Sequence, residues 1–276
     1  MINIHYNGGG FGNQMFQYCF ARLLAEKNNI YLNAKFNYDH VLETTKPLHQ
    51  IHSESPNKPH RVIGDDVYYR WRSRHGSQIP NLDPDWDYTV SGYFQDAELF
   101  NNNESLVRSF FALPVIPKNT TDTLVTLRLG DFLHDGYNSE IIHYQWYQEA
   151  MAEMPGKKDI LACIFRAREV KSTPEQEEKY IGKLVKEDIG TITKTGSDLI
   201  ADLKMRFSYD NIICSNSTFS WWGCFLGGAK NITTFYDFGH FGPTMHKCHG
   251  IHINQLRNIR NVSHAKKGSF LDISGL

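Results

Sequence analysis

The chain has 276 residues, of which 41% are hydrophobic and 21% are charged, and its formal net charge is −1. A net charge so close to zero excludes a protein that coats nucleic acid or another polyanion through bulk charge. The hydrophobic fraction suits an ordinary globular core, and the length suits one large domain or two modest ones.

The sequence shows no sign of export or of membrane insertion. No apolar run approaches the length of a membrane span, and the N-terminus lacks a signal-peptide pattern. The five cysteines are an odd number scattered along the chain, which fits free thiols in a reducing compartment. We therefore expect a soluble, cytoplasmic protein with no nucleic-acid partner, and the sequence leaves the oligomeric state open.

The N-terminal stretch predicts a strand, a glycine-rich turn and a helix. Ile2 and Ile4 alternate with polar residues, residues 7–14 hold four glycines, and an amphipathic helix is expected over residues 15–27. Glycines let the backbone turn sharply and approach a ligand closely. Asn13 stands where the dinucleotide fingerprint needs a glycine, and the Lys-Ser/Thr of a P-loop is missing. A ligand loop and a purely structural turn both remain open.

The next part of the chain is less regular. A strand is expected at residues 30–33, followed by a poor pattern over residues 35–78, a strand at 89–94 and a helix at 96–110. Residues 68–75 mix basic and aromatic side chains that could stack on bases or on sugar rings. In a chain of neutral charge, such a patch is more typical of a surface or core-edge segment.

Two groups of residues have spacings known from metal sites. Asp83 and Asp85 have the Asp-x-Asp spacing of metal-dependent sugar transferases, but they lie in a proline-containing loop with no apolar strand before it. Four residues near the C-terminus match no closed zinc pattern. They are His246, Cys248, His249 and His252. No metal site is therefore predicted.

A linker and a strand with a cationic end follow. Residues 114–121 contain two prolines and polar residues that indicate a linker. The strand expected at residues 124–127 delivers Arg128 at its C-terminal end, with Gly130 and Asp131 just after. Functional groups of open α/β sheets gather at that end of the strands. A lone arginine is usually part of a surface ion pair, but here it is a candidate to bind a diphosphate through two oxygens.

Alternating helices and strands continue to residue 236. Helices are expected at residues 144–154, 173–186 and 198–207, the last capped by Ser197, and strands at residues 159–165, 212–214 and 232–236. After the strand at 212–214, Ser217 and Thr218 can cap a helix that runs to Leu226. Amide groups at such a helix start can bind phosphate, although an ordinary capped connection has the same pattern. Strand–helix alternation on both sides of the linker predicts an α/β protein with two Rossmann-like halves and a ligand site in the cleft between them.

Four stretches resemble the signatures of glycosyltransferase family 11, the α-1,2-fucosyltransferases. Residues 9–18 resemble the opening signature of that family, and residues 92–95 resemble a second segment. Residues 127–132 are similar to its His-x-Arg-Arg-Gly-Asp-Tyr motif, and residues 216–223 to its third signature. Asp202 stands at the family's upstream aspartate position. These matches span most of the chain in the order of the family.

The resemblance implies an inverting, metal-independent enzyme that moves L-fucose from GDP-β-L-fucose to a hydroxyl of an oligosaccharide acceptor through an α-1,2 linkage. It implies the two-domain B-type architecture of glycosyltransferases (GT-B), in which two Rossmann-like domains face a cleft. Residues 1–118 would then form the acceptor side, and residues 119–276 would bind GDP-fucose. No cofactor is implied beyond the donor substrate.

The resemblance also implies the site residues. Arg128 corresponds to the arginine that grips the β-phosphate, and Asp131, together with Asp135, is a candidate general base. Asp202 could accept hydrogen bonds from the N1–H and the exocyclic amine of guanine. The donor-binding candidates are Phe11, Gly12, Asn13, Arg128, Asp202, Ser217, Thr218 and Phe219.

Two positions and one three-residue segment depart from the family. Thr126 replaces the histidine of the arginine motif, and Leu129 replaces its second arginine. Residues 166–168 read Arg-Ala-Arg where the family has Ser-Asp-Asp, which leaves guanine recognition open. Two alternatives therefore stay beside the fucosyltransferase hypothesis: a transferase for another nucleotide sugar, and a non-catalytic protein of the same fold that binds a nucleotide or a glycan.

Overall fold

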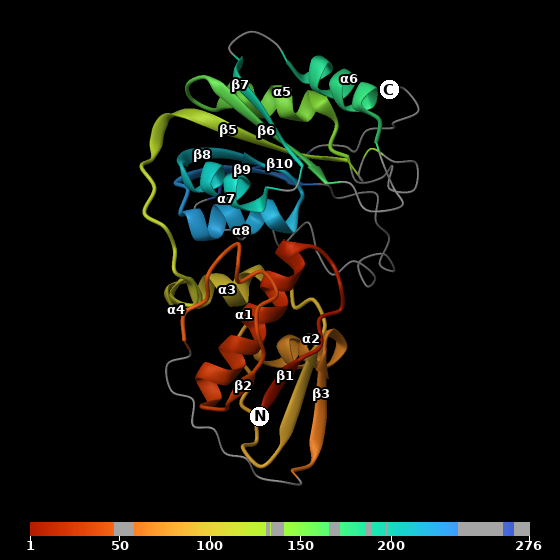
Figure 1. Ribbon diagram of the computed structural model, residues 1–276, viewed down its shortest axis with the longest axis vertical. Helices are drawn as coiled ribbons and strands as arrows, with labels where there is room; N and C mark the ends of the chain where they lie inside the picture. The colour runs from red at the N-terminus through yellow and green to blue at the C-terminus, as the bar shows by residue number, and fades with distance from the viewer. Residues whose placement is uncertain are drawn as a thin grey trace. The chain divides into compact units, whose positions relative to one another are not determined.

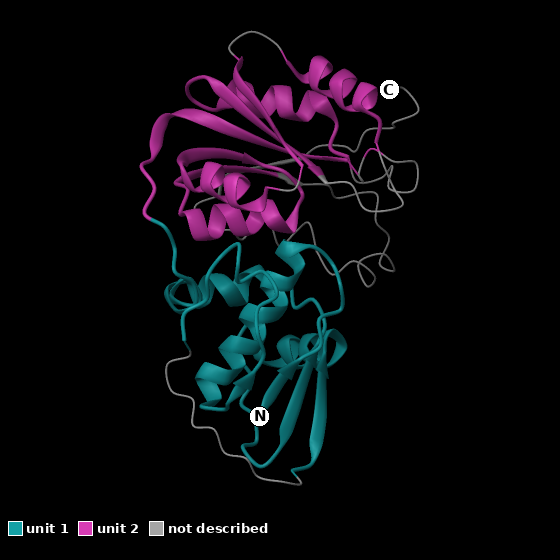
Figure 2. Ribbon diagram, in the orientation of Figure 1, with its two compact units in different colours: residues 1–114 teal, residues 115–276 magenta. Residues whose placement is uncertain are grey.

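A computed structural model describes residues 1–46, 58–130, 133, 141–165, 172–185, 189–196, 198–236 and 262–267 of the protein. The chain divides into two compact units, unit 1 at Met1–Pro114 and unit 2 at Val115–Leu276 (Figure 2). The division falls inside the segment 114–121 that the sequence indicates as a linker. Each unit is an α/β structure built on one parallel sheet, which is compatible with Rossmann-like folds.

Unit 1 contains a four-stranded sheet in the order β2-β1-β4-β3, in which every pair is parallel (Figure 1). The strands are β1 (Ile2–Ile4), β2 (Leu32–Asn33), β3 (His60–Gly64) and β4 (Asp87–Ser91). β1 lies between β2 and β4, so the glycine-rich segment after β1 leaves from the middle of the sheet.

The first helix, α1 (Phe11–Asn28), begins four residues earlier than the sequence pattern predicts and is not amphipathic. Fourteen of its eighteen residues are buried, on all sides of the helix. It packs against β1, β2 and β4, and its aromatic rings also contact Tyr68 in α2 (Asp65–His75) and Phe100 in α3 (Ala97–Asn102). A helix that is buried on all sides shows no single apolar stripe, which is why the expected periodicity was a poor guide here.

The rest of unit 1 departs most from the sequence prediction. The poorly patterned region holds β3 and an eleven-residue helix, α2 (Asp65–His75), of which the mixed basic and aromatic residues 68–75 are part. The single helix expected at residues 96–110 is two short helices, α3 (Ala97–Asn102) and α4 (Glu104–Ser109), that meet at Asn103.

Unit 2 contains a six-stranded parallel sheet in the order β10-β9-β8-β5-β6-β7. The strands are β5 (Asn119–Gly130), β6 (Lys158–Phe165), β7 (Ile189–Thr195), β8 (Tyr209–Cys214), β9 (Asn231–Tyr236) and β10 (Val262–Lys267). Numbered from the start of the unit, this order is 6-5-4-1-2-3, the order of Rossmann sheets, so the chain reverses direction across the sheet between β5 and β8. The sequence did not predict β7 or β10.

Four helices in the described part of unit 2 cover this sheet. Figure 1 shows α5 (Tyr144–Glu153) and α6 (Pro174–Leu184) on one face, and α7 (Leu199–Phe207) and α8 (Thr218–Gly227) on the other. Along β5, Val125, Leu127 and Leu129 belong to the apolar core beneath α5 and α6. Because side chains alternate along a strand, Thr126 and Arg128 lie on the opposite face, toward α7 and α8.

The cap of α7 also differs from expectation. Asp198 is the N-cap, and its carboxylate accepts a hydrogen bond from the amide of Ala201 at 2.9 Å. Ser197, which was expected there, lies outside the described residues. An aspartate cap satisfies an orphan amide and also meets the positive end of the helix dipole.

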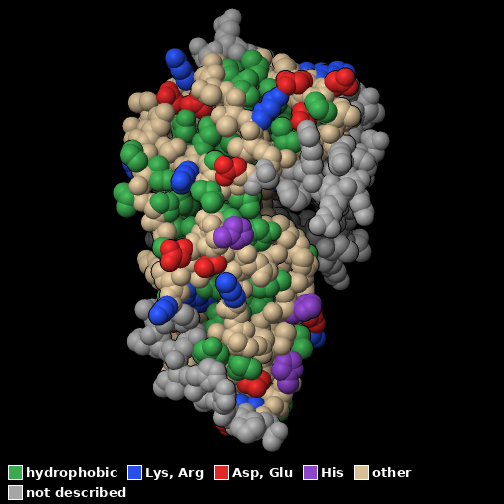
Figure 3. Space-filling view, in the orientation of Figure 1, with side chains coloured by type: hydrophobic (Ala, Val, Ile, Leu, Met, Phe, Trp, Pro, Cys, Tyr) green, Lys and Arg blue, Asp and Glu red, His purple; other side chains and the backbone are tan. Residues whose placement is uncertain are grey.

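The surface is of mixed character. Lysine and arginine side chains are interspersed with aspartate and glutamate on the face shown in Figure 3. The large hydrophobic side chains that are exposed in the described residues occur singly along the sequence, at Val62, Val67, Val115, Ile192 and Ile200. None of the described helices is both long and apolar enough to cross a membrane.

Candidate functional site

The sheet of unit 2 has its crossover between β5 and β8. In open α/β sheets ligands bind outside the carboxyl ends of the strands at this point, because the connections on either side leave toward opposite faces. Here β5 ends at Gly130 and β8 ends at Cys214. The edge therefore brings together Arg128 and the turn at residues 215–219, which we call the crossover turn. The sequence predicted phosphate binding both at Arg128 and at the start of the helix in this turn.

Arg128 lies inside β5 rather than just after it, two residues before the strand ends. It pairs in register with Cys163 on β6, and it is half-buried. Cys163 pairs in register with Thr195 on β7. Arg128, Cys163 and Thr195 thus form a row across three strands at the carboxyl edge of the sheet. Asp131 and Asp135 lie outside the described residues.

The crossover turn leads from β8 into α8. Ser217 is the N-cap of α8, and its hydroxyl accepts a hydrogen bond from the amide of Phe219 at 3.3 Å, as the sequence predicted. Thr218 is the first helical residue and not the cap. Residues 216–219 are half-buried, whereas β8 before them and the helix after them are buried almost throughout. The turn is therefore the accessible part of this connection.

The first residue of the turn, Ser215, is held from both sides. Its amide donates to the hydroxyl of Thr126 on β5 at 2.9 Å, and the same hydroxyl donates to the carbonyl of Ile213 at 3.0 Å. The hydroxyl of Ser215 lies 2.6 Å from that of Ser220 in α8. Ser220 in turn accepts from the guanidinium of Arg206 at 2.9 Å.

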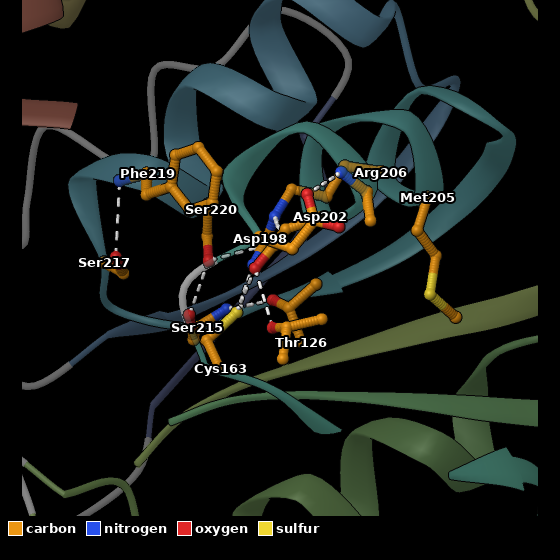
Figure 4. A network of polar contacts seen from close by, with 12 residues as sticks. Thr126, Cys163, Asp198, Asp202, Met205, Arg206, Ser215, Ser217, Phe219 and Ser220 are labelled. Carbon is orange, nitrogen blue, oxygen red and sulfur yellow. Dashed lines mark hydrogen bonds and ion pairs between the residues drawn. The ribbon is translucent and has the colours of Figure 1, made fainter. Parts of the chain in front are cut away.

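Arg206 belongs to a buried ion pair with Asp202 one turn earlier in α7 (Figure 4). The Nε of Arg206 donates to Oδ1 of Asp202 at 2.6 Å. The second oxygen of Asp202 accepts from the thiol of Cys163 at 2.7 Å and from the hydroxyl of Thr195 at 3.0 Å. Arg206 also donates to the sulfur of Cys163 at 2.9 Å. Asp202, the predicted guanine reader, is thus buried, and both of its oxygens have partners inside unit 2.

Burial and neighbouring charges shift the pKa values of Arg206 and Cys163. Burial alone would lower the pKa of Arg206, but the carboxylate of Asp202 raises that pKa above its ordinary value. Burial raises the pKa of Cys163 to about 11, with Arg206 acting to lower it and Asp202 to raise it. Arg206 therefore stays cationic and the thiol stays protonated near neutral pH, so the network carries one charge pair and no thiolate.

α8 makes room for this arginine at Gly223. A Cβ placed on Gly223 would lie 2.3 Å from the Cδ of Arg206. The guanidinium of Arg206 also lies 5.1 Å from the centre of the Phe219 ring, measured from Cζ. The guanidinium therefore reaches the start of α8 because the middle of that helix carries no side chain above it.

The remaining donor-binding candidates, Phe11, Gly12 and Asn13, lie in the first turn of α1, directly after the glycine-rich turn of unit 1. Gly8 and Gly9 have φ near +77° and +78°, which favours glycine, and Gly10 occupies the N-cap position of α1. Asn13 is half-buried and accepts from the side-chain amide of Gln95 at 3.1 Å.

Phe11 and Gly12 are buried at the start of α1, and the ring of Phe11 packs edge-on against those of Phe36 and Tyr38. Phe11, Gly12 and Asn13 belong to unit 1, whereas Arg128 and the crossover turn belong to unit 2. Their meeting in one site stays a prediction.

Neither metal-like pattern gains support from the part of the chain that the structure describes. No group of three or more metal-binding side chains is found within it. Asp83 uses a side-chain oxygen to accept the amide of Asp85 at 3.0 Å, which is the bond of an ordinary turn. The cluster at residues 246–252 lies outside the described residues.

Sequence reasoning gave Thr126 no contact role, and it assigned no role in the site to Arg206, Cys163 or Gly223. For Arg206 a signal was present, because an aspartate four residues before an arginine on one helix is a common ion-pair spacing. For the other three, the contacts join residues far apart in the chain, so no local pattern reveals them.

One comparison with known proteins gives a relative. The chain is 22% identical over 280 residues to the O-antigen biosynthesis glycosyltransferase WbnK of Escherichia coli, and the match covers 79% of this chain and 88% of that protein. The chain matches no family model and no solved structure.

Proposed function

We propose that the chain is a glycosyltransferase that moves L-fucose from GDP-β-L-fucose to a glycan hydroxyl, with inversion, without a metal ion and through an α-1,2 linkage. The observation that carries this proposal is the crossover of the unit 2 sheet, where Arg128 and the crossover turn share the edge at which such sheets bind ligands. The similarity to a glycosyltransferase of O-antigen biosynthesis supports the reaction class. The motif resemblance supports the fucose donor and the GT-B arrangement.

The proposed chemistry follows from where charge develops. Breaking the bond between fucose and GDP places negative charge on the β-phosphate and gives the sugar oxocarbenium character. The planar guanidinium of Arg128 can bind two phosphate oxygens at once. The amides at the start of α8 add hydrogen-bond donors and the positive end of a helix dipole. In this proposal Phe11, Gly12 and Asn13 also contact the donor. The acceptor oxygen attacks the face of the sugar opposite the diphosphate as the bond to GDP breaks, and the hydroxyl proton passes to a general base, for which Asp131 and Asp135 are the candidates.

The contacts of Asp202 suggest a second role for it beside direct guanine binding, which is support of the crossover turn. Its carboxylate is engaged by Arg206, Cys163 and Thr195, so a direct contact with guanine requires it to leave a buried ion pair. The affinities of the Asp202→Asn variant for GDP and for pyrophosphate distinguish the two roles. A direct reader loses affinity for GDP but not for pyrophosphate, whereas a residue that supports the crossover turn loses affinity for both.

The experiment that tests the function is turnover and binding with defined nucleotides. We expect GDP and GDP-fucose to raise the melting temperature, because a ligand that binds only the native state stabilises it, and we expect UDP to have no such effect. We expect GDP release from GDP-fucose to rise with a glycan acceptor and to be unimpaired by EDTA.

Equal thermal shifts with GDP and UDP would contradict the guanine assignment and favour another nucleotide sugar. Binding without turnover on any acceptor would favour a non-catalytic protein. Activity that is lost on chelation and restored by Mn²⁺ would contradict the metal-independent mechanism.

A further inference from the structure

The registered pairing between β5 and β8 ends near the carboxyl edge of the sheet, just before the crossover turn. The last pair in register is Val125 with Ile213. Beyond this pair the buried amide of Ser215 needs a partner, because buried main-chain groups are almost always paired. The hydroxyl of Thr126 accepts from this amide at 2.9 Å and donates to the carbonyl of Ile213 at 3.0 Å. A single buried hydroxyl thus continues the ladder at the point where the strands separate.

The same residue, Ser215, is held a second time through its side chain. Its hydroxyl meets that of Ser220, which accepts from Arg206. Arg206 is fixed by Asp202, and that carboxylate is fixed by side chains from β6 and β7 (Figure 4). The main chain of Ser215 is therefore held from β5 and its side chain from α7 and α8.

Directly after this doubly held residue come the half-buried residues 216–219. Donors that stabilise developing charge act best when their positions are fixed before the reaction, and binding geometry must be held within about 0.5 Å. We propose that Thr126 and Arg206 are positioning residues, which fix the crossover turn in the conformation that receives the diphosphate of the donor. The identity of that ligand rests on the proposed function, whereas the positioning itself does not.

β5 supplies a matched control. Thr123, three residues earlier on the strand, is as fully buried as Thr126, and its hydroxyl donates to the carbonyl of Pro155 at 2.6 Å. Thr123→Val and Thr126→Val make the same chemical change on the same strand. Only the second touches the crossover turn.

The first measurement is the affinity of the whole chain for GDP and for inorganic pyrophosphate by calorimetry. A net hydrogen bond corresponds to roughly a tenfold change in affinity, so we expect Thr126→Val to weaken both probes about tenfold or more. Thr126→Ser keeps the hydroxyl and should restore most of the affinity, and Thr123→Val should change it by less than about threefold. Equal losses for the two valine variants overturn the proposal.

Ser220→Ala provides a second route should Thr126→Val fold poorly, because it removes the other hold on Ser215. We expect it to weaken both probes as well. Normal affinity in a folded Ser220→Ala protein overturns the role of Arg206.

Amide hydrogen exchange tests the positioning without any ligand. Exchange at residues 215–219 should be faster in Thr126→Val than in Thr123→Val, and equal rates overturn the proposal. If the unmodified chain binds neither GDP nor pyrophosphate, the proposed ligand fails, and the exchange rates alone decide whether these residues fix the turn.

Discussion

The two units contain the same local arrangement with opposite surroundings. In α2 of unit 1, Arg70 pairs with Asp66 four residues earlier at 2.9 Å, and in α7 of unit 2, Arg206 pairs with Asp202 four residues earlier at 2.6 Å. The side chains of the first pair are 72% and 76% exposed, whereas those of the second are 1% and 5% exposed. The spacing and the residue types are the same, and the largest difference between the pairs is burial.

Burial changes what such a pair does. In water the attraction is weak and is offset by the entropy of ordering two long side chains, so exposed pairs contribute about 0.2–1 kcal/mol. In the interior each charge depends on the other, because removing one partner leaves a buried charge uncompensated. The exposed pair is therefore a minor feature of α2, whereas the buried pair supports a network that reaches the crossover turn.

The largest expected effect comes from neutralising each aspartate in turn. Asp202→Asn leaves Arg206 as a buried cation without an anion, and we expect a loss of roughly 3–5 kcal/mol in the free energy of unfolding. Asp66→Asn should change that free energy by less than about 0.5 kcal/mol. Urea unfolding of both variants makes the measurement. Similar losses for the two would show that burial is not what separates the pairs.

A third arginine extends the comparison to catalysis. Arg128 is half-buried at the carboxyl edge, and under the proposed function Arg128→Ala should lower kcat/KM for transfer by about 10²–10³-fold. Arg128→Lys should recover little, because an ammonium cannot bind two phosphate oxygens in one plane. Steady-state rates measured beside melting temperatures test this expectation. A folded Arg128→Ala protein with near-normal turnover would remove the residue from the mechanism.

The turns of the two units are both held by buried side chains, but only the turn of unit 1 depends on glycine. Gln14 donates to the carbonyl of Gly9 at 3.2 Å, and Gly9 has a positive φ, with a Cβ there lying 2.5 Å from the Nδ2 of Asn13. Gly9→Ala should lower the free energy of unfolding by about 1–3 kcal/mol through its positive φ and this contact. Gly10→Ala, with no such φ and nothing within 4 Å, should change it by less than about 1 kcal/mol. Thermal unfolding of the two variants ranks them, and the reverse order would contradict this account of the turn.

The smallest expected effect is on thiol chemistry. With its pKa raised to about 11, Cys163 should react slowly with iodoacetamide at pH 8, and its rate should grow as the pH rises toward 11. Asp202→Asn removes a charge that raises this pKa and leaves Arg206, which lowers it, so labelling should become severalfold faster. Mass spectrometry of the labelled peptides gives the rates. The fully buried Cys19 of unit 1 is the control, and its rate should not follow the change at Asp202.

The sequence predicted what depends on local pattern. The strand that carries Arg128 and the cap at Ser217 were visible because apolar runs and capping residues are local signals. Unit 1 was harder. β3 is an edge strand with mostly exposed residues and α2 buries little beyond Tyr68, so neither shows a clear period.

Prediction from the sequence failed at the site for one physical reason. Asp202 was read as free to meet a base because its partners Cys163 and Thr195 lie on other strands, and only the fold brings them to it. The ion pair of Arg206 with Asp202 could have been predicted from their spacing of four residues. The burial of this pair could not, because it depends on how α7 packs against α8.

The missing side chain at Gly223 ties two distant positions of the sequence together. Any residue larger than glycine at position 223 collides with the stem of Arg206, and any short residue at position 206 leaves a gap beneath α8. The two positions are therefore coupled: a larger residue at position 223 requires a shorter one at position 206, and a shorter one there also leaves Asp202 without its cation. In a collection of related sequences this coupling should appear as covariation. For protein engineering it means that stabilising α8 by replacing its central glycine also requires redesigning residue 206.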